Sequence, residues 1–252
     1  MNVIINADDF GINQVVTSEI TRLIRSGLIT STTIMANGTE LDTVKEVVAS
    51  NPSISFGVHV CLSEFSSLTK SKVFHDNHLT DDSGKFIKKA IMQIKHPSDD
   101  LKQAILDEIL AQIGTIQSLN VPISHIDSHH HVHTIKWLYP LFCEAAKTYG
   151  IKKIRLGQEF LDVRSKLHLL QYWERNKLNK HIKGSFTAAD MFMSYSNSLK
   201  YLSTIKKCKV QTLELMCHPG HPSEKYAKEI REIESGLLNK VLDYTLISYN
   251  DL

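Results

Sequence analysis

The chain has 252 residues, of which 42% are hydrophobic and 22% are charged, so it is long enough to bury a full core and has the composition of a globular protein. Its 29 basic and 27 acidic residues give a net charge of +2 without a long run of either sign, which argues against nucleic acid or an anionic membrane as the main partner. The four cysteines are widely spaced, and we find neither a signal-peptide pattern nor an apolar run of about 18 residues, so we expect reduced thiols in a cytoplasmic protein.

Short β-rich runs alternate with segments of helical spacing in the first quarter of the chain. The run "VIINAD" reads as a buried strand, and the segment after it has apolar residues at helical spacing with Gly27 as a stop signal. The same alternation then continues. We predict strands over 3–8, 28–37 and 53–62 and helices over 13–27 and 39–50.

The chain then changes character and later resumes the alternation. Residues 66–97 are polar and irregular, with "DDSGK" as a turn, and are the best candidate for an inserted loop or lid. A long amphipathic helix follows, which Ser98 or Asp99 could cap. Residues 160–195 fit no clear pattern. We predict further helices over 98–119, 135–150, 199–207 and 223–238. We predict strands over 121–131, where the strand runs into a loop, and over 152–157, 212–220 and 244–250.

Strand–helix alternation predicts a parallel sheet with helices outside it. About seven such units in one chain favour a distorted or incomplete (β/α) TIM-like barrel, formed by a single domain over residues 1–252. An open, doubly wound sheet is the alternative.

The unusual polar residues follow the predicted strands, where parallel α/β folds place their active sites. Five of the 13 histidines lie within nine residues in the stretch "HIDSHHHVH". Other histidines and carboxylates end different strands. The residues in these positions are Asp8, Asp9, Asn37, His59, Asp127, His129, Arg155 and His218.

Such a set of imidazoles and carboxylates predicts a divalent metal site. Asp9, His59 and His129 could supply one carboxylate and two imidazoles from three strands. Each of these features has another interpretation. A lone His59 could be a core residue, and the carboxylates of "ADDFG" could cap a helix. The histidine cluster could also bind metal adventitiously.

These stretches resemble the YdjC-like carbohydrate deacetylase family, which includes chito-oligosaccharide deacetylases. The matching segments cover nearly the whole chain outside 158–200. They are "NADDFG", "GLITSTTIMANG", "FGVHVCL", "HIDSHHHVH", "IRLG", "LELMCHPG" and "LISYNDL".

The resemblance implies a distorted (β/α) barrel that removes N-acetyl groups from amino sugars with one divalent metal. By position, Asp9, His59 and His129 would bind the metal, and Asp8 would be the general base. His218 is similar to the family's histidine near the leaving group, and Arg155 to a positioning residue. The family also leads us to expect a homodimer.

The chemistry of amide hydrolysis agrees with these roles. A metal activates water and polarises the carbonyl, a carboxylate takes a proton, and an imidazole protonates the leaving nitrogen. If the chain stays extended after His129, His131 and His133 would face the same cavity. Asn37 and Asp127 would bind substrate or orient ligands, while His125 would either orient a ligand or simply pack.

Two other functions remain open from the sequence. A metal-dependent phosphoesterase or amidohydrolase on a similar barrel would need a second metal, and a non-catalytic sugar-binding relative would not need Asp8. The identity of the acetylated sugar is also open. Imidazoles suit zinc, whereas the carboxylate also suits magnesium.

Overall fold

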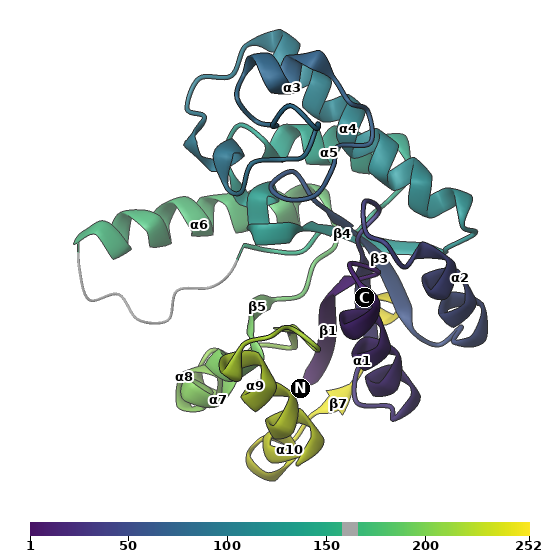
Figure 1. Ribbon diagram of the computed structural model, residues 1–252. Helices are drawn as coiled ribbons and strands as arrows, with labels where there is room; N and C mark the ends of the chain where they lie inside the picture. The colour runs from purple at the N-terminus through teal and green to yellow at the C-terminus, as the bar shows by residue number, and fades with distance from the viewer. Residues whose placement is uncertain (158–165) are drawn as a thin grey trace.

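A computed structural model describes residues 1–157 and 166–252, with the side chains of 166–171 left out of the description. The described strands and helices alternate from the N-terminus (Figure 1). The strands are β1 (Asn2–Phe10), β2 (Ser31–Ile34), β3 (Ser55–Val60), β4 (Ile123–Ser128), β5 (Met191–Ser194), β6 (Thr212–Cys217) and β7 (Thr245–Leu246). The α-helices are α1 (Gln14–Arg25), α2 (Leu41–Ser50), α3 (Lys72–Asp76), α4 (Asp99–Ser118), α5 (Tyr139–Thr148), α6 (Lys166–Ser185), α7 (Tyr195–Lys200), α8 (Leu202–Lys207), α9 (Glu224–Glu234) and α10 (Leu237–Val241). Three 3₁₀ turns span Ala90–Gln93, His129–Thr134 and Tyr249–Asp251.

The strands form one parallel sheet in the order β4-β3-β2-β1-β6-β5, with β7 pairing β1 at its start. This sheet is a half-barrel in a single α/β domain, as the strand–helix alternation predicted. Two isolated parallel bridges extend the hydrogen bonding beyond β4, from Ile126 to Ile154 and from Lys153 to Thr187. The predicted short strand at 152–157 is therefore present only as these bridges.

Local sequence signals explain where the helices begin and end. The Asn13 side chain accepts a hydrogen bond from the Val16 N–H at the start of α1, and Gly27 adopts φ 68° just beyond its end. The Ser98 side chain caps α4 by accepting from the Leu101 N–H, which decides between the two residues that could have capped it.

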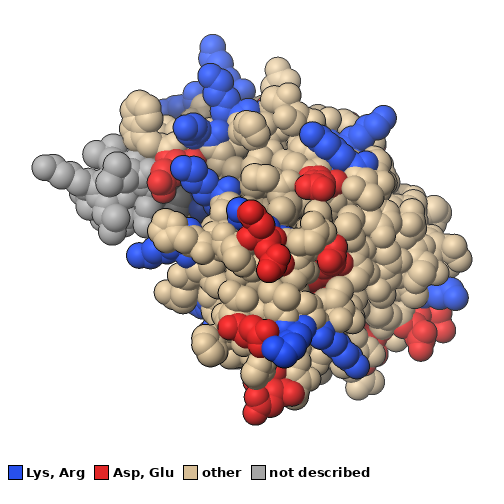
Figure 2. All heavy atoms as spheres, turned by 90° about the horizontal axis from the view of Figure 1, so that it is seen from above, with Lys and Arg blue, Asp and Glu red and all other residues tan. Residues whose placement is uncertain are grey.

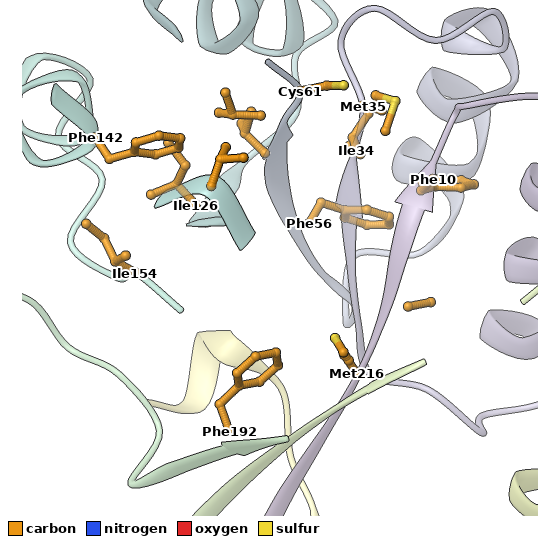
Figure 3. Close-up of a cluster of buried hydrophobic side chains, with 14 of the residues drawn as sticks. Phe10, Ile34, Met35, Phe56, Cys61, Ile126, Phe142, Ile154, Phe192 and Met216 are labelled. Carbon is orange, nitrogen blue, oxygen red and sulfur yellow. The ribbon is translucent and has the colours of Figure 1, made fainter. Parts of the chain in front are cut away.

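The core lies between the sheet and its covering helices. All residues of β2, β3 and β5 are buried, as are all residues of β1 except Asn2, so these strands are covered on both faces. Figure 3 shows Phe10 of β1, Phe56 of β3 and Phe192 of β5 inside this core, with the rings of Phe10 and Phe56 stacked at 6.5 Å. Burial of each such ring contributes about 1.5–3 kcal/mol, so the strands are held rigidly where their carboxyl ends carry polar residues.

Residues 66–97 form no strand–helix unit, yet they are tied to the rest of the fold. The buried Glu108 carboxylate of α4 accepts hydrogen bonds from the backbone N–H of Leu68 and of Thr69, at 3.0 and 2.9 Å. The Asn37 side chain, in the loop after β2, donates to the Ser66 carbonyl oxygen at 3.3 Å. The segment therefore sits on α4 and beside the carboxyl end of β2.

Candidate metal and catalytic site

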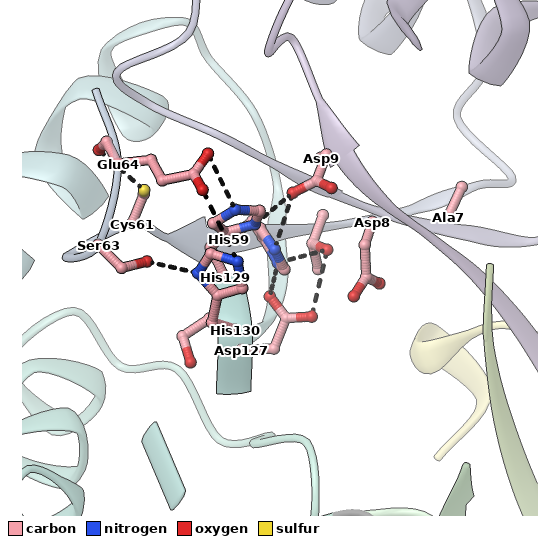
Figure 4. Close-up of polar contacts among 12 residues, drawn as sticks. Ala7, Asp8, Asp9, His59, Cys61, Ser63, Glu64, Asp127, His129 and His130 are labelled. Atoms are coloured by element: carbon pink, nitrogen blue, oxygen red, sulfur yellow. Dashed lines mark hydrogen bonds and ion pairs between the residues drawn. The ribbon is translucent and has the colours of Figure 1, made fainter. Parts of the chain in front are cut away.

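Asp8 and Asp9 lie near the end of β1, where the strand is irregular. The register between β1 and β2 shifts between Ala7 and Phe10, and Asp9 adopts φ 71°. A non-glycine residue in this left-handed region is strained, and such strain concentrates at functional sites. The carboxylates of Asp8 and Asp9 point in different directions, as Figure 4 shows.

Asp9 lies among three imidazoles. Its Oδ1 atom is 3.1 Å from Nε2 of His59 and 2.8 Å from Nδ1 of His129. Its Oδ2 atom is 2.9 Å from Nε2 of His221. Asp9, His59 and His129 are all buried, so the structure brings together the three residues that the sequence suggested as ligands.

The Asp9–His221 pair points to a cation. Asp9 Oδ2 and His221 Nε2 are close, but within residues 1–157 and 166–252 neither atom has a partner with hydrogen-bond geometry. Buried polar atoms that converge without pairing are costly unless something satisfies them. A divalent metal is the group that one carboxylate and several imidazoles fit, so the residues present suit the metal that the sequence suggested.

Sequence reasoning missed His221, although the motif "HPGH" contained it. Gly220 lies between it and the end of β6 with φ 76°, and a Cβ atom there would come within 2.8 Å of the Val16 Cα atom. The glycine thus lets the turn pack against the start of α1. That close approach carries His221 to Asp9.

His59 is oriented by a second carboxylate. Its Nδ1 atom is 2.6 Å from Asp127 Oδ1, which leaves Nε2 directed at Asp9. Burial lowers the pKa of His59, but the charges of Asp127 and Asp9 outweigh it and raise that pKa well above its ordinary value. A carboxylate behind a ligating imidazole is the usual support of a metal site, so Asp127 suits the orienting role that the sequence suggested.

Asp8 is held by Arg155, which reaches it from the stretch after β4. Two guanidinium nitrogens lie 2.7 Å from the two Asp8 oxygens, and both side chains are buried. Burial raises the pKa of Asp8, but the Arg155 charge outweighs it and holds that pKa well below its usual range. Asp8 is therefore ionised at neutral pH.

Arg155 also contacts two further buried carboxylates. Asp127 Oδ2 lies 2.5 Å from Nη1, and Glu214 Oε1 lies 2.7 Å from Nε. Burial raises the pKa of Glu214 to about 7 despite the neighbouring Arg155. The sequence analysis did not select Glu214, although it lies within "LELMC" as a charged residue in an otherwise apolar strand.

Glu64 is another acidic residue that the sequence analysis passed over. Its carboxylate oxygens lie 3.8 Å from Nε2 of His129 and 3.8 Å from Nε2 of His130, and Lys88 Nζ is 2.8 Å from Oε1. The Ser63 hydroxyl is 2.8 Å from Nδ1 of His130. Glu64 therefore stands behind His129 on the side away from Asp9 (Figure 4).

His218 follows β6, as predicted, and has no part in the ligand cluster. Its Nδ1 atom is buried and has no hydrogen-bond partner in the part of the chain that the structure describes, and its ring lies 4.5 Å from that of Tyr226. Burial lowers the pKa of His218, which the charges of Asp8 and Asp9 only partly oppose. The imidazole is thus near both aspartates but is not paired with either.

The expectation for His131 and His133 is wrong in its premise, because the chain turns after His129 instead of staying extended. His130 and His131 adopt φ values of 55° and 54° within a 3₁₀ turn. His133 Nδ1 is 2.6 Å from the Ser128 hydroxyl, and the His131 ring packs edge-on against Phe192.

His125 and Asn37 lie at the edges of the site. The His125 ring stacks on Tyr249 with centroids 3.6 Å apart, over Gly57, where a Cβ atom would come within 2.6 Å of the ring. Packing is therefore the role that the contacts of His125 favour. Asn37 contacts residue Ser66 rather than the carboxylate cluster. The unassigned region 158–200 lies partly outside the described residues.

The chain was compared with known proteins. A family model described as "YdjC-like protein" matches residues 2–243. A carbohydrate deacetylase of Vibrio campbellii is 29% identical over 220 residues, covering 87% of this chain and 78% of that protein. A carbohydrate deacetylase of Clostridium beijerinckii is 26% identical over 266 residues and covers both chains fully.

A solved structure has the same fold. It is a protein from Enterococcus faecalis, described provisionally as a cellobiose-phosphate cleavage protein, with a TM-score of 0.73 and 22% identity over 99% of this chain and 98% of that one. Among the described residues, no helix is both long and apolar enough to cross a membrane. Because the family model spans almost the whole sequence, the chain belongs to the YdjC-like protein family.

Proposed function

We propose that this protein is a metal-dependent carbohydrate deacetylase that hydrolyses the N-acetyl group of an amino sugar, with a chito-oligosaccharide as the first candidate substrate. The observation that supports it most is the separation of the two aspartates. Asp9 faces three imidazoles, whereas Asp8 faces Arg155. One carboxylate is thus available to a metal and its neighbour to a proton. Relatives named carbohydrate deacetylase support the substrate class.

In this proposal Asp9, His59 and His129 hold the metal, with His221 as a further candidate ligand. A divalent metal bound there would polarise the acetyl carbonyl and lower the pKa of water. Zinc and magnesium both fit a set of imidazoles and one carboxylate, and the two imidazoles favour zinc. The TIM-like barrel of the sequence prediction would place this cluster at its carboxyl-end rim.

The other residues divide the proton transfers. Asp8, ionised and fixed by Arg155, accepts the proton of the attacking water. His218 donates a proton to the departing amine, which its place near both aspartates supports. Because burial lowers its pKa, the ring must first take up that proton during turnover. Arg155 keeps Asp8 oriented and charged. Asn37 and residues 66–97 line the approach and select the sugar.

A hydrolase with two metals is the alternative that one observation favours. Glu64, His129 and His130 form a second group whose ligand atoms lie within 4.8 Å of one another. However, Lys88 Nζ already pairs with Glu64 at 2.8 Å, and a cation there would face its charge. The deacetylase with one metal is therefore the better supported function.

The proposed partners follow from the same argument. The substrate is an acetylated sugar, and Figure 2 shows basic and acidic side chains interspersed on the face seen from above, in keeping with a net charge of +2. All four cysteines are described and unpaired, which supports a reducing, cytoplasmic setting. The homodimer stays a prediction.

A mass-spectrometric screen of N-acetylated oligosaccharides tests the function. We expect one substrate to lose an acetyl group, and we expect chelator to abolish the loss and added zinc or magnesium to restore it. If no acetylated sugar loses mass while a phosphoester is hydrolysed, the alternative function is correct.

Variants of the two aspartates test which residue binds the metal and which accepts the proton. We expect Asp9→Asn to lose metal, since an amide oxygen is an uncharged and poorer ligand. Asp8→Asn should keep the metal and lower kcat roughly 10²–10⁴-fold with little change in KM, because an amide cannot accept the proton. Metal content by elemental analysis, measured beside kcat, decides between these roles, and metal lost only from Asp8→Asn would reverse them.

A further inference from the structure

The C-terminal segment reaches into the interior close to the site. Tyr249 is fully buried, and the Ser248 and Asp251 side chains hold the turn around it in a capping box. Its backbone N–H donates to the Ser55 hydroxyl at 3.0 Å, and its ring stacks on His125. Its hydroxyl donates to Glu214 Oε2 at 2.5 Å.

Glu214 connects this tyrosine to Arg155. Its other oxygen, Oε1, accepts from Arg155 Nε at 2.7 Å, and the two terminal nitrogens of the guanidinium are each 2.7 Å from an Asp8 oxygen. Tyr249, Glu214, Arg155 and Asp8 thus form a continuous chain of direct hydrogen bonds. All four side chains are between 0% and 1% exposed.

The planarity of the guanidinium explains why this chain matters to Asp8. Its donors lie in one fixed fork, so an acceptor on the Nε edge sets the plane in which the Nη atoms can meet a carboxylate. Glu214 occupies that edge, and the Tyr249 hydroxyl fixes the rotation of the Glu214 carboxylate. Among the described residues, neither Glu214 nor Tyr249 hydrogen-bonds to Asp8 or to the ligand cluster, so the hydrogen-bonded route from them to the base runs through Arg155.

We propose that Tyr249 and Glu214 are positioning residues that set the orientation of the Asp8 carboxylate through Arg155. The inference rests on the proposed function in assigning Asp8 as the base. It gives the 3₁₀ turn Tyr249–Asp251 a role in turnover, since the hydroxyl that starts the hydrogen-bond chain belongs to Tyr249.

The test compares Tyr249→Phe with Tyr149→Phe in the full-length protein. Both variants lose one hydroxyl, but the Tyr149 hydroxyl donates to the Leu110 carbonyl oxygen at 3.1 Å, outside the chain of bonds. We expect Tyr249→Phe to lower kcat about 10–100-fold, as partners behind functional groups do. KM and metal affinity should change less than about twofold. Tyr149→Phe should leave kcat unchanged, and equal kcat values for the two variants would overturn the inference.

Two double-mutant cycles of Tyr249→Phe with Asp8→Asn, one in kcat and one in the free energy of unfolding, separate a positioning role from a general loss of stability. In the Asp8→Asn background, Tyr249→Phe should cost no further turnover, because the residue it positions is already gone; a full additional loss contradicts the proposal. The same pair should be non-additive in the free energy of unfolding, although the two side chains do not touch. Should Tyr249→Phe fold poorly, Glu214→Gln, which keeps the size of the side chain, takes its place in both cycles.

The outcomes also distinguish this inference from the proposed function. If the wild-type protein deacetylates no sugar, the proposed function fails, and the unfolding cycle still decides whether Tyr249 and Asp8 are coupled. If the wild-type protein is active and both cycles are additive, the function stands and the positioning role is wrong.

Discussion

At the residue scale, His218 differs from His59, His129 and His221 because no carboxylate among the described residues pairs with it. Its unpartnered Nδ1 and its place near Asp8 and Asp9 leave it free to exchange a proton with a bound substrate. We expect His218→Ala to keep the metal and to slow turnover roughly 10²–10⁴-fold. Steady-state kinetics on two substrates measures this, and the substrate with the better leaving group should recover part of the loss. An equal loss on both, or loss of metal, contradicts the acid role.

Glu64 is the second residue whose environment suggests a measurable effect. Asp127 stands behind His59, and Glu64 stands behind His129 at 3.8 Å from Nε2, with Lys88 holding its carboxylate. We expect Glu64→Gln to weaken metal binding by about 10-fold, within the range for partners of ligating histidines. Calorimetric titration with zinc measures the affinity. Glu46→Gln, the same change at an exposed glutamate of α2, serves as the control. An unchanged zinc affinity in Glu64→Gln would mean that Glu64 does not support His129.

At the scale of elements, the interaction between α4 and residues 66–97 shows how an irregular segment can be well anchored. The Glu108 carboxylate accepts from two backbone N–H groups and from the Thr69 hydroxyl, and Gln112 of the same helix donates to it at 2.8 Å. A carboxylate that accepts hydrogen bonds from several backbone N–H groups satisfies donors that would otherwise pair with a neighbouring strand.

Glu108→Ala should therefore release the segment. Orphaning two backbone donors should cost about 2–4 kcal/mol of unfolding free energy. Limited proteolysis should cut within 66–97 first, and oligosaccharide preference should change more than metal affinity. Asp107→Ala, one position earlier on the exposed face of α4, is the matched control. Cleavage elsewhere in the chain, or equal stability of the two variants, would contradict the anchoring role.

At the scale of the whole molecule, the buried charge around Arg155 should make stability depend on pH. One guanidinium contacts three buried carboxylates, and burial raises the pKa of Glu214 to about 7. In the unfolded chain this carboxyl ionises near its ordinary value of about 4.3. Between these two values the folded protein holds a proton on Glu214 that the unfolded chain has released, so the contribution of Glu214 to stability should fall as pH rises from about 4 to 7 and then level off.

Glu214→Gln should remove this slope, because the amide does not titrate. The difference in unfolding free energy between the metal-free wild type and the variant should change by about 3 kcal/mol across that window. Chemical denaturation at a series of pH values measures it. Parallel curves for the two proteins would mean that Glu214 titrates normally.

The sequence by itself determined the order of the elements and the identity of the central residues. Period-two and period-3.6 patterns depend on local burial, so β1, β3, β4 and β6 and the long helix α4 could be read from composition and spacing. Asp9, His59 and His129 could be selected because parallel strands bring their carboxyl ends to one edge, so residues far apart in the chain meet there.

Only the tertiary structure decided the partners of these residues. His221 and Glu64 reach the site through a tight glycine turn and the loop after β3, neither of which has a periodic signal in the sequence. Glu214 lies on β6, where the pattern predicts a buried strand but not the contact with Arg155. The turn at His130 and His131 redirects His131 and His133 because two left-handed residues break the alternation that an extended chain would keep. Local patterns specify which side chains are buried, whereas distances between side chains follow from the packing of segments distant in sequence.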